Sequence, residues 1–307
     1  MAKSRSVEGK VAVVTGAGRG IGRGIALELA AEGAMVVVND LGGSVGGQGA
    51  DETLAQQVVD EIKDAGGVAV ANTDSVSNPD SAHQIVTCAM DTFGSIDIVV
   101  NNAGILRDRF FFNMSIEEWT AVIDVHLNGT FYVSRAAAGH FKNQGSGSYV
   151  HMTSTSGLLG NFGQANYGAA KLGIVALSRA IAFDMRRNNV RSNCIAPFAW
   201  SRMGATIKAE TPEKQAWLDK AKAALDATKI APIAVALASE AAGEVTGQVF
   251  AVRGNEVFLM SQPRPVRGMH REERWTSDDV SNRVFPAMKS AFTPLENSAE
   301  VFCWDPI

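Results

Sequence analysis

The sequence is poor in cysteine and has no long apolar or basic run, and each shortage excludes a class of protein. Its 307 residues include only Cys88, Cys194 and Cys303, which are too scattered for a disulfide framework or a zinc cluster. No apolar stretch approaches the roughly 20 residues of a transmembrane helix. We also find no signal peptide and no C-terminal peroxisomal tripeptide. A net charge of −4 without lysine or arginine runs argues against nucleic acid or an anionic membrane as partner. We therefore expect a reduced, cytoplasmic protein without a bound metal.

Short runs of apolar, β-branched residues alternate with longer helical patterns over residues 1–258. Runs without polar alternation are typical of strands covered on both faces. We expect strands at 11–15, 35–39, 68–71, 98–101, 149–152, 190–195 and 249–252, and helices near 21–32, 53–65, 79–93, 115–141, 166–187 and 230–239. Ser115, with Glu118 three residues on, marks the start of the fourth helix. Repeated βαβ units predict one α/β domain, a Rossmann-type doubly wound parallel sheet with helices on both faces. Residues 201–228 interrupt this rhythm where ligands commonly bind, and we expect a substrate loop there.

Residues 259–307 read as a C-terminal extension outside that domain. They contain five of the nine prolines, and we expect one helix near 277–292, capped by Ser277. Apolar residues recur there at helical spacing and must be buried somewhere. Phe302 and Trp304 would add apolar anchors beyond the helix. We expect the extension to pack across the outside of the core or onto a neighbouring subunit, and to help close the substrate pocket. A disordered tail is the alternative.

A glycine-rich loop follows the first expected strand and opens the first helix. Thr15–Gly22 reads TGAGRGIG, and its glycines let the backbone turn tightly beside a pyrophosphate at the positive end of the helix. Such loops also serve as plain turns, but this placement favours a dinucleotide site. Asp40 ends the second strand, where a carboxylate can accept the ribose hydroxyls of NAD and repels the 2'-phosphate of NADP. Arg19 favours NADP, yet we expect the repulsion to dominate, so the predicted cofactor is NAD.

Tyr167 and Lys171 are four residues apart in a helical pattern and so share one helix face. A free tyrosine has a pKa of about 10 and is a poor base at neutral pH. A nearby ammonium and the positive nicotinamide ring would lower that pKa. The same spacing is common by chance, and alone it also fits an ordinary surface pair.

Together these motifs resemble the short-chain dehydrogenase/reductase family over residues 1–258, in the branch with a TGxxxGxG loop. Asn101–Gly104 matches its NNAG motif, Asp74 the acidic residue near the adenine, and Ser154 the serine that holds the substrate oxygen. The resemblance implies that Tyr167 is the base and that Lys171 holds the nicotinamide ribose. The cofactor contacts that it implies, together with those argued above, are Gly16, Arg19, Gly20, Ile21, Gly22, Asp40, Asp74, Ser75, Asn101, Asn102, Ala103, Gly104, Tyr167, Lys171, Pro197, Ala199 and Ser201.

Within that family a narrower likeness is carried by Asn39–Gly43, Ala103–Arg109, Val125–Leu127, Gly160–Tyr167 and Ser201–Met203. These segments are similar to the dehydrogenase parts of type 2 peroxisomal multifunctional enzymes, which are also classed among the 17β-hydroxysteroid dehydrogenases. That branch implies NAD-dependent oxidation of a secondary alcohol in a 3-hydroxyacyl-CoA or a steroid-like substrate. The family implies a homotetramer. A dehydrogenase of another cyclic or terpenoid alcohol is an alternative. A non-catalytic cofactor sensor is a second one, although such a sensor could dispense with the serine, tyrosine and lysine that are present here.

Three positions depart from the family pattern. His126 stands where the family has a fourth-helix asparagine that completes a catalytic tetrad, and a titrating and a structural histidine are both open. Phe198 replaces a glycine and Arg253 replaces an acidic residue near the last strand. These two changes affect the expected pocket and subunit contacts, not the hydride chemistry. Trp200 and Met203 are candidates for an apolar substrate pocket or for core packing.

Overall fold

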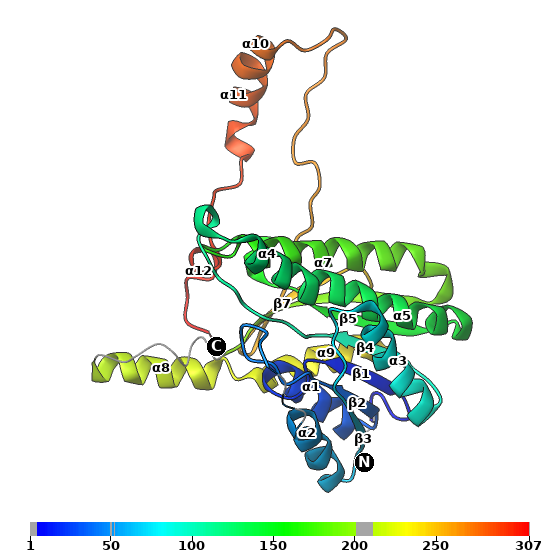
Figure 1. The fold of residues 1–307 in the computed structure, drawn as a ribbon. Coiled ribbons are helices and arrows are strands. Elements are labelled where there is room, and N and C mark those ends of the chain that lie inside the picture. Colours follow the sequence, from blue (N-terminus) through cyan, green and yellow to red (C-terminus); the bar gives the residue numbers. More distant parts are fainter. Residues whose placement is uncertain (1–4, 50, 52, 201–210, 307) are drawn as a thin grey trace.

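The structure is a computed structural model that describes residues 5–49, 51, 53–200 and 211–306. Over these residues the chain forms an eight-stranded sheet in the order β3-β2-β1-β4-β5-β6-β7-β8 (Figure 1). The strands are β1 (Val11–Thr15), β2 (Met35–Asn39), β3 (Val68–Asn72), β4 (Ile98–Asn101), β5 (Gly147–Met152), β6 (Val190–Phe198), β7 (Val249–Arg253) and β8 (Glu256–Leu259). The pairings from β3 to β7 are all parallel, which confirms the predicted doubly wound sheet.

The eighth strand is the part of the sheet that the sequence reading missed. It pairs antiparallel with β7, and Arg253 lies opposite Glu256 across a two-residue turn. Gly254 takes a φ of 62° at the first central position of that turn, a conformation in which glycine carries no steric penalty. The Gly-Asn pair was therefore a readable hairpin signal.

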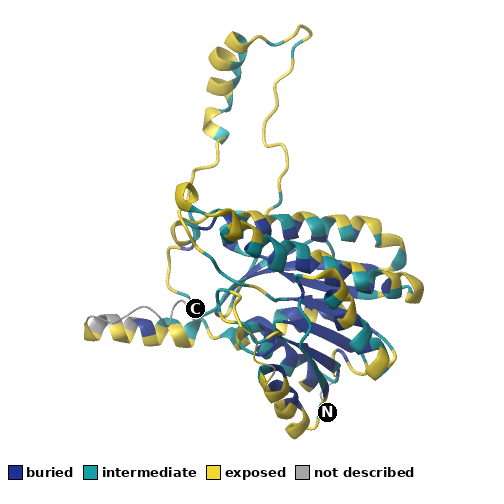
Figure 2. Ribbon diagram, viewed as in Figure 1, coloured by how far each residue is buried: buried dark blue, intermediate teal, exposed yellow. Residues whose placement is uncertain are grey.

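Helices cover both faces of the sheet (Figure 1). One face carries α1 (Gly20–Ala31), α2 (Thr53–Asp64) and α9 (Ala231–Ala238), and the other carries α3 (Pro79–Phe93), α4 (Ile116–Ile123), α5 (Gly129–Gln144) and α7 (Ala165–Asp184). Buried residues concentrate in the strands and on the helix sides that face them (Figure 2). Ile25 and Ile62 belong to the core of the first face, and Ile85 and Phe141 to that of the second. Two further helices are α6 (Thr155–Leu158) and α8 (Pro212–Ala224).

The helix expected at 115–141 is interrupted. It begins as predicted, with the Ser115 hydroxyl accepting from the Glu118 amide at 3.1 Å and the Glu118 carboxylate accepting from the Ser115 amide at 3.0 Å. A π-helical turn over Asp124–Asn128 then separates α4 from α5. Such turns insert one extra residue and often occur at functional sites. This one carries His126.

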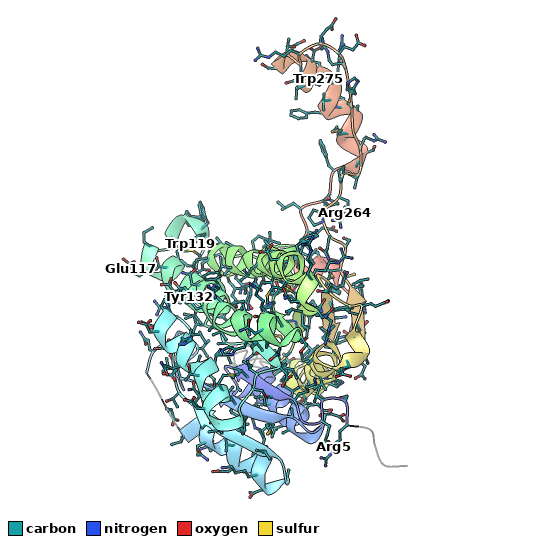
Figure 3. All side chains as sticks on the ribbon, turned by 90° about the vertical axis from the view of Figure 1, so that its right-hand side faces the viewer. Arg5, Glu117, Trp119, Tyr132, Arg264 and Trp275 are labelled. Atoms are coloured by element: carbon teal, nitrogen blue, oxygen red, sulfur yellow. The ribbon has the colours of Figure 1, made fainter. Side chains whose placement is uncertain are left out.

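Residues 261–296, here called the arm, leave the body of the molecule and return to it (Figure 1). The arm contains α10 (Ser277–Asp279), a π-helical turn at Val280–Val284 and α11 (Phe285–Met288). Its helical segment is capped by Thr276, one residue before the expected Ser277. Arg264 lies near its base and Trp275 toward its outer end (Figure 3). The expectation that the extension lies across its own core is therefore wrong for this segment. That the arm packs onto a neighbouring subunit stays a prediction.

Residues 297–306, here called the clasp, bring the chain back to the β7–β8 edge of the sheet through α12 (Ser298–Val301). Phe302 is buried, and its ring centroid lies 4.8 Å from that of Phe198 and 5.3 Å from that of Phe258. The Arg253 guanidinium lies 5.4 Å from the centre of the Trp304 ring. The prediction that Phe302 and Trp304 anchor the extension is confirmed, and the anchor is the chain's own sheet edge.

We expect truncation after Pro263 to weaken subunit assembly or raise KM, because Phe292 is 58% and Leu295 100% exposed in the single chain. Truncation also removes the clasp, so the Phe285→Ser/Phe292→Ser double variant is the matched test with the clasp retained. Light scattering and steady-state kinetics measure both properties. Unchanged oligomeric state, stability and kinetics in both variants would rule out a role for the arm in assembly or in the pocket.

Candidate active site

The loops that follow β1 and β4 are joined to each other. The Thr15 hydroxyl accepts from the backbone amides of Asn102 at 3.0 Å and Ala103 at 3.1 Å. The Asn102 side chain donates to the carbonyls of Thr15 at 2.9 Å and Gly16 at 3.0 Å. A Cβ on Gly16 would lie 2.7 Å from the Ala103 Cα, and one on Gly22 would clash with the Asn102 side-chain nitrogen. These two glycines are thus required by the close approach of the two loops.

A cleft of about 640 Å³ opens beside this joint. Most of the predicted cofactor residues line it: Gly16, Arg19, Gly20, Ile21, Asp40, Asp74, Ser75, Asn102, Ala103, Gly104, Tyr167, Pro197 and Ala199. Trp200 lines it as well, whereas Ser201 and Met203 lie outside the described residues. The volume falls in the usual range of ligand pockets. Gly20, with a φ of 57° and no atom within 4 Å of an added Cβ, leaves open space at the start of α1.

Asp40 is held rigidly at the rim of this cleft. Its Oδ2 accepts from the Gly18 amide at 2.8 Å and its Oδ1 accepts from the Gly42 amide at 2.7 Å. A Cβ on Gly18 would lie 2.8 Å from the same Oδ2, so glycine is needed there. The Arg19 guanidinium donates to the carbonyls of Gly42 and Gly43, both at 3.4 Å. The Asp40 carboxylate is thus fixed beside the cleft, and the Arg19 guanidinium is hydrogen-bonded to backbone carbonyls.

Asp74 and Ser75 line the same cleft beside Asp40, just after the end of β3. The Asn72 side chain donates to the Asp74 carboxylate at 2.7 Å, and the Asn39 side chain donates to the Asp74 carbonyl at 2.9 Å. These bonds join the ends of β2 and β3. They hold Asp74 at the end of the cleft farthest from Tyr167 in the sheet order.

Asn101 is placed differently from the expectation. Its amide lies in the core, where Nδ2 is 3.0 Å from the Ser134 hydroxyl and 3.1 Å from His151 Nδ1. His151 is fully buried on β5, and burial lowers its pKa to about 3, so the ring is neutral. Its Nε2 lies 3.1 Å from the Ser192 hydroxyl. Sequence reasoning missed this polar connection, although a histidine within the apolar run of β5 was a visible signal.

Ser154, Tyr167 and Lys171 are brought together as the sequence predicted. Ser154 follows β5 and caps α6, and its side chain lines the same cleft as Tyr167 on α7, where it acts on the pKa of the phenol. Lys171 Nζ donates to the Met152 carbonyl at 2.6 Å and lies 5.5 Å from the centre of the Tyr167 ring. Tyr167 and Lys171 also line a cavity of about 200 Å³ that adjoins the cleft.

Burial controls the ionisation of this group. It raises the pKa of Tyr167 to about 12, opposed by the Ser154 hydrogen bond and reinforced by the negative charge of Asp108. It lowers the pKa of Lys171 to about 7. In the chain without a ligand, desolvation therefore outweighs the expected effect of the lysine on the tyrosine. Additional positive charge within the cleft, or a further hydrogen bond to the phenolate, would lower the phenol pKa.

His126 lies against Tyr167, with ring centroids 5.2 Å apart and planes at 89°. Its Nε2 lies 2.8 Å from the Ile105 carbonyl oxygen and 3.1 Å from the Ile105 amide nitrogen, so the Ile105 backbone fixes the ring. Burial, with a smaller effect of the Lys171 charge, lowers its pKa to about 3. The histidine is thus neutral at physiological pH. Of the two possibilities left open by the sequence, this geometry favours a structural ring that forms the wall of the cavity.

Gly104 provides a test of that wall. A Cβ there would lie 2.3 Å from His126 Cε1, so Gly104→Ala must displace a buried ring, and we expect it to lower the free energy of unfolding by about 1–3 kcal/mol. Gly139→Ala is the control. Gly139 is exposed within α5 with open space around it, so alanine should stabilise the protein by about 0.5–1 kcal/mol. Urea unfolding measures both, and equal effects of the two substitutions would contradict the clash.

In sequence and in fold, the chain is similar to known enzymes. A family model described as enoyl-(acyl carrier protein) reductase matches residues 16–254. The crystal structure of a short-chain dehydrogenase from Mycobacterium avium superposes with a TM-score of 0.81 at 39% identity, covering 94% of this chain and 98% of the other.

Two relatives carry more specific names. A hydroxyacyl-CoA dehydrogenase of Mycobacterium tuberculosis is 42% identical over 288 residues, which cover 90% of this chain and 85% of that protein. The mouse peroxisomal multifunctional enzyme type 2 is 51% identical over 210 residues, which cover 68% of this chain. The matched region spans only 28% of the mouse protein.

Proposed function

This chain belongs to the short-chain dehydrogenase/reductase family, and we propose that it is an NAD-dependent dehydrogenase of a 3-hydroxyacyl-CoA or hydroxysteroid alcohol. The observation that carries the proposal is the meeting of Ser154, Tyr167 and Lys171 at one end of a cleft that has Asp40 on its rim. The relatives' names favour the acyl-CoA class of substrate. Because this chain spans little of the mouse enzyme, no other activity of that enzyme is carried over.

The residues of the cleft fit a nicotinamide dinucleotide. The open space at Gly20 lies where the backbone amides and the positive end of α1 favour a pyrophosphate. The fixed carboxylate of Asp40 suits ribose hydroxyls and repels a 2'-phosphate, which supports NAD over NADP. When bound, NAD supplies the hydride acceptor and a positive charge near Tyr167.

Side chains of this chain bind the substrate oxygen, take its proton and orient the ribose. Ser154 Oγ and Tyr167 Oη hold the substrate oxygen, and Tyr167 Oη takes its proton. A base placed in this way contributes about 10²–10⁴-fold to the rate. Lys171 Nζ is fixed by the Met152 carbonyl and orients the ribose next to the reacting ring. Partial burial desolvates the phenol, so its pKa responds strongly to each nearby charge.

NADH formation over a panel of 3-hydroxyacyl-CoAs, hydroxysteroids and cyclic or terpenoid alcohols tests the proposal directly. Turnover confined to the cyclic alcohols would favour the alternative dehydrogenase. Cofactor binding without turnover of any alcohol would favour a cofactor sensor.

Tyr167→Phe should lower kcat by at least about 10²-fold, because it removes the base, while the Kd for NADH stays nearly unchanged. Tyr132→Phe is the matched control, since Tyr132 lines a separate groove between α3 and α5. Initial rates and NADH fluorescence give the two readouts. Activity of Tyr167→Phe within tenfold of the parent would exclude the mechanism.

Asp40→Ser should raise the ratio of kcat/KM for NADP to that for NAD by about tenfold or more, which corresponds to about 1.4 kcal/mol of lost repulsion. Asp91→Asn, an exposed carboxylate on α3, controls for the change in net charge. The ratio is measured with both cofactors at one substrate concentration. A parent enzyme that already prefers NADP would overturn the assignment of NAD.

The homotetramer and the cytoplasmic location expected from the sequence stay predictions. Among the described residues, no helix has both the length and the apolar character needed to cross a membrane. Sedimentation and cell fractionation test the two predictions.

A further inference from the structure

Residues 43–48, here called the strap, cross from the end of β2 toward the loop that follows β4. In the sheet, β1 lies between β2 and β4, so a segment that joins the two outer strand ends must pass over the end of β1. The glycine loop of the cleft begins at that end. Figure 1 shows this segment as a blue loop that projects beside α1.

Two hydrogen bonds and one packing contact join the strap to the loop after β4. The Leu106 amide donates to the Val45 carbonyl at 3.0 Å, and Arg107 Nε donates to the Gly46 carbonyl at 3.1 Å. An added Cβ on Gly47 would lie 3.1 Å from Ile105 Cδ1, so the strap backbone packs directly on that side chain.

The near side of the strap begins at a turn that requires glycine. Gly42 has a φ of 77°, and a Cβ there would lie 2.2 Å from the Asp51 amide nitrogen. Within the strap, the Gly47 amide donates to the Ser44 carbonyl at 3.0 Å and the Gln48 amide to the Ser44 hydroxyl at 3.1 Å. The strap therefore has its own internal turn, and glycines with positive φ, Gly42 and Gly49, stand at its two ends.

The strap forms a wall of both cavities. Gly43, Ser44 and Gly47 line the cleft of about 640 Å³, as do Gly16 and Gly20 of the glycine loop. Val45 lines the cavity of about 200 Å³ that also contains Tyr167 and Lys171. A ligand that extends from Asp74 to Tyr167 within the cleft must pass the strap.

We propose that the strap closes over the bound dinucleotide and that Arg107 is the positioning residue that latches it, so the cofactor enters and leaves only when the strap opens. The inference rests on the proposed function, namely that the cleft takes a nicotinamide dinucleotide. Arg107 acts through the Gly46 carbonyl and does not touch the reacting atoms.

A reversible cross-link tests the strap. The Cβ of an alanine-sized residue at Gly47 would lie 3.7 Å from Ile105 Cβ, close to the Cβ–Cβ distance of about 3.8 Å in a disulfide. The Gly47→Cys/Ile105→Cys variant is prepared in a Cys303→Ser background, because Cys303 is exposed. Each single variant controls for the substitution itself, including the strain of a cysteine at a φ of 78°.

Stopped-flow NADH fluorescence then compares the oxidised and reduced forms. Oxidation before loading should slow NADH association by about tenfold or more, and oxidation after loading should slow its dissociation equally. A reductant should restore both rates, while the single variants show no redox dependence. Rates that agree within about twofold despite a complete disulfide overturn the proposal. A failure of the two thiols to bond overturns it as well, since they then do not lie side by side.

The latch is tested separately with Arg107→Ala. NADH dissociation should accelerate by about five- to tenfold, while the single-turnover rate of hydride transfer stays unchanged. Arg109→Ala is the matched control, because Arg109 pairs with Glu118 at 2.9 Å instead of the strap. An unchanged dissociation rate in Arg107→Ala removes the role of Arg107. If the parent binds NADH but neither experiment changes the rates of NADH association or dissociation, the strap proposal is wrong and the proposed function stands. If the parent does not bind NADH, the proposed function is wrong as well.

Discussion

The contact between the loops after β1 and β4 is the constraint on which the site depends. One hydroxyl, that of Thr15, accepts two backbone amides of the neighbouring loop, and the Asn102 side chain returns two bonds. Removing such a partner leaves buried donors unsatisfied, at a cost of about 1–3 kcal/mol for each group. The close approach excludes any side chain at Gly16, and so fixes the path by which the chain enters α1. Gly18 then holds Asp40 to this fixed path, and Arg19 holds the strap to it through the Gly43 carbonyl.

Desolvation determines which ionisable groups of the site are neutral. The same burial that raises the pKa of Tyr167 lowers that of Lys171, so both groups are driven toward their neutral forms. His126 and His151 are neutral for the same reason. The folded chain therefore avoids much of the cost of burying isolated charges. In such surroundings a charge that arrives with a ligand is weakly screened, and it acts on the phenol more strongly than it would in water.

Uninterrupted apolar runs made the parallel strands predictable, and helical spacing placed Tyr167 beside Lys171. Strand alternation could also have separated Asn101 from Asn102, because neighbouring side chains on a strand face opposite ways. Other features depend on contacts between distant parts of the chain. The strap reads as a flexible glycine-rich loop until Arg107, 61 residues from Gly46, is seen to hold it. The π-helical turn before α5 depends on packing between helices, and an apolar stripe reveals the helical part of the arm but not its direction.

Two departures from the family pattern are explained by a single contact surface. Phe198 on β6 and Arg253 on β7 are direct partners in the sheet register, and both hold the clasp: Phe198 through the ring of Phe302, and Arg253 through that of Trp304. The same apolar cluster includes Leu158 and Leu159, which belong to the turn that Ser154 caps. A glycine and a carboxylate at the two sheet positions would leave the clasp without its aromatic and cationic contacts. The clasp therefore braces the segment that carries Ser154, so the last residues of the C-terminal extension support one wall of the candidate site.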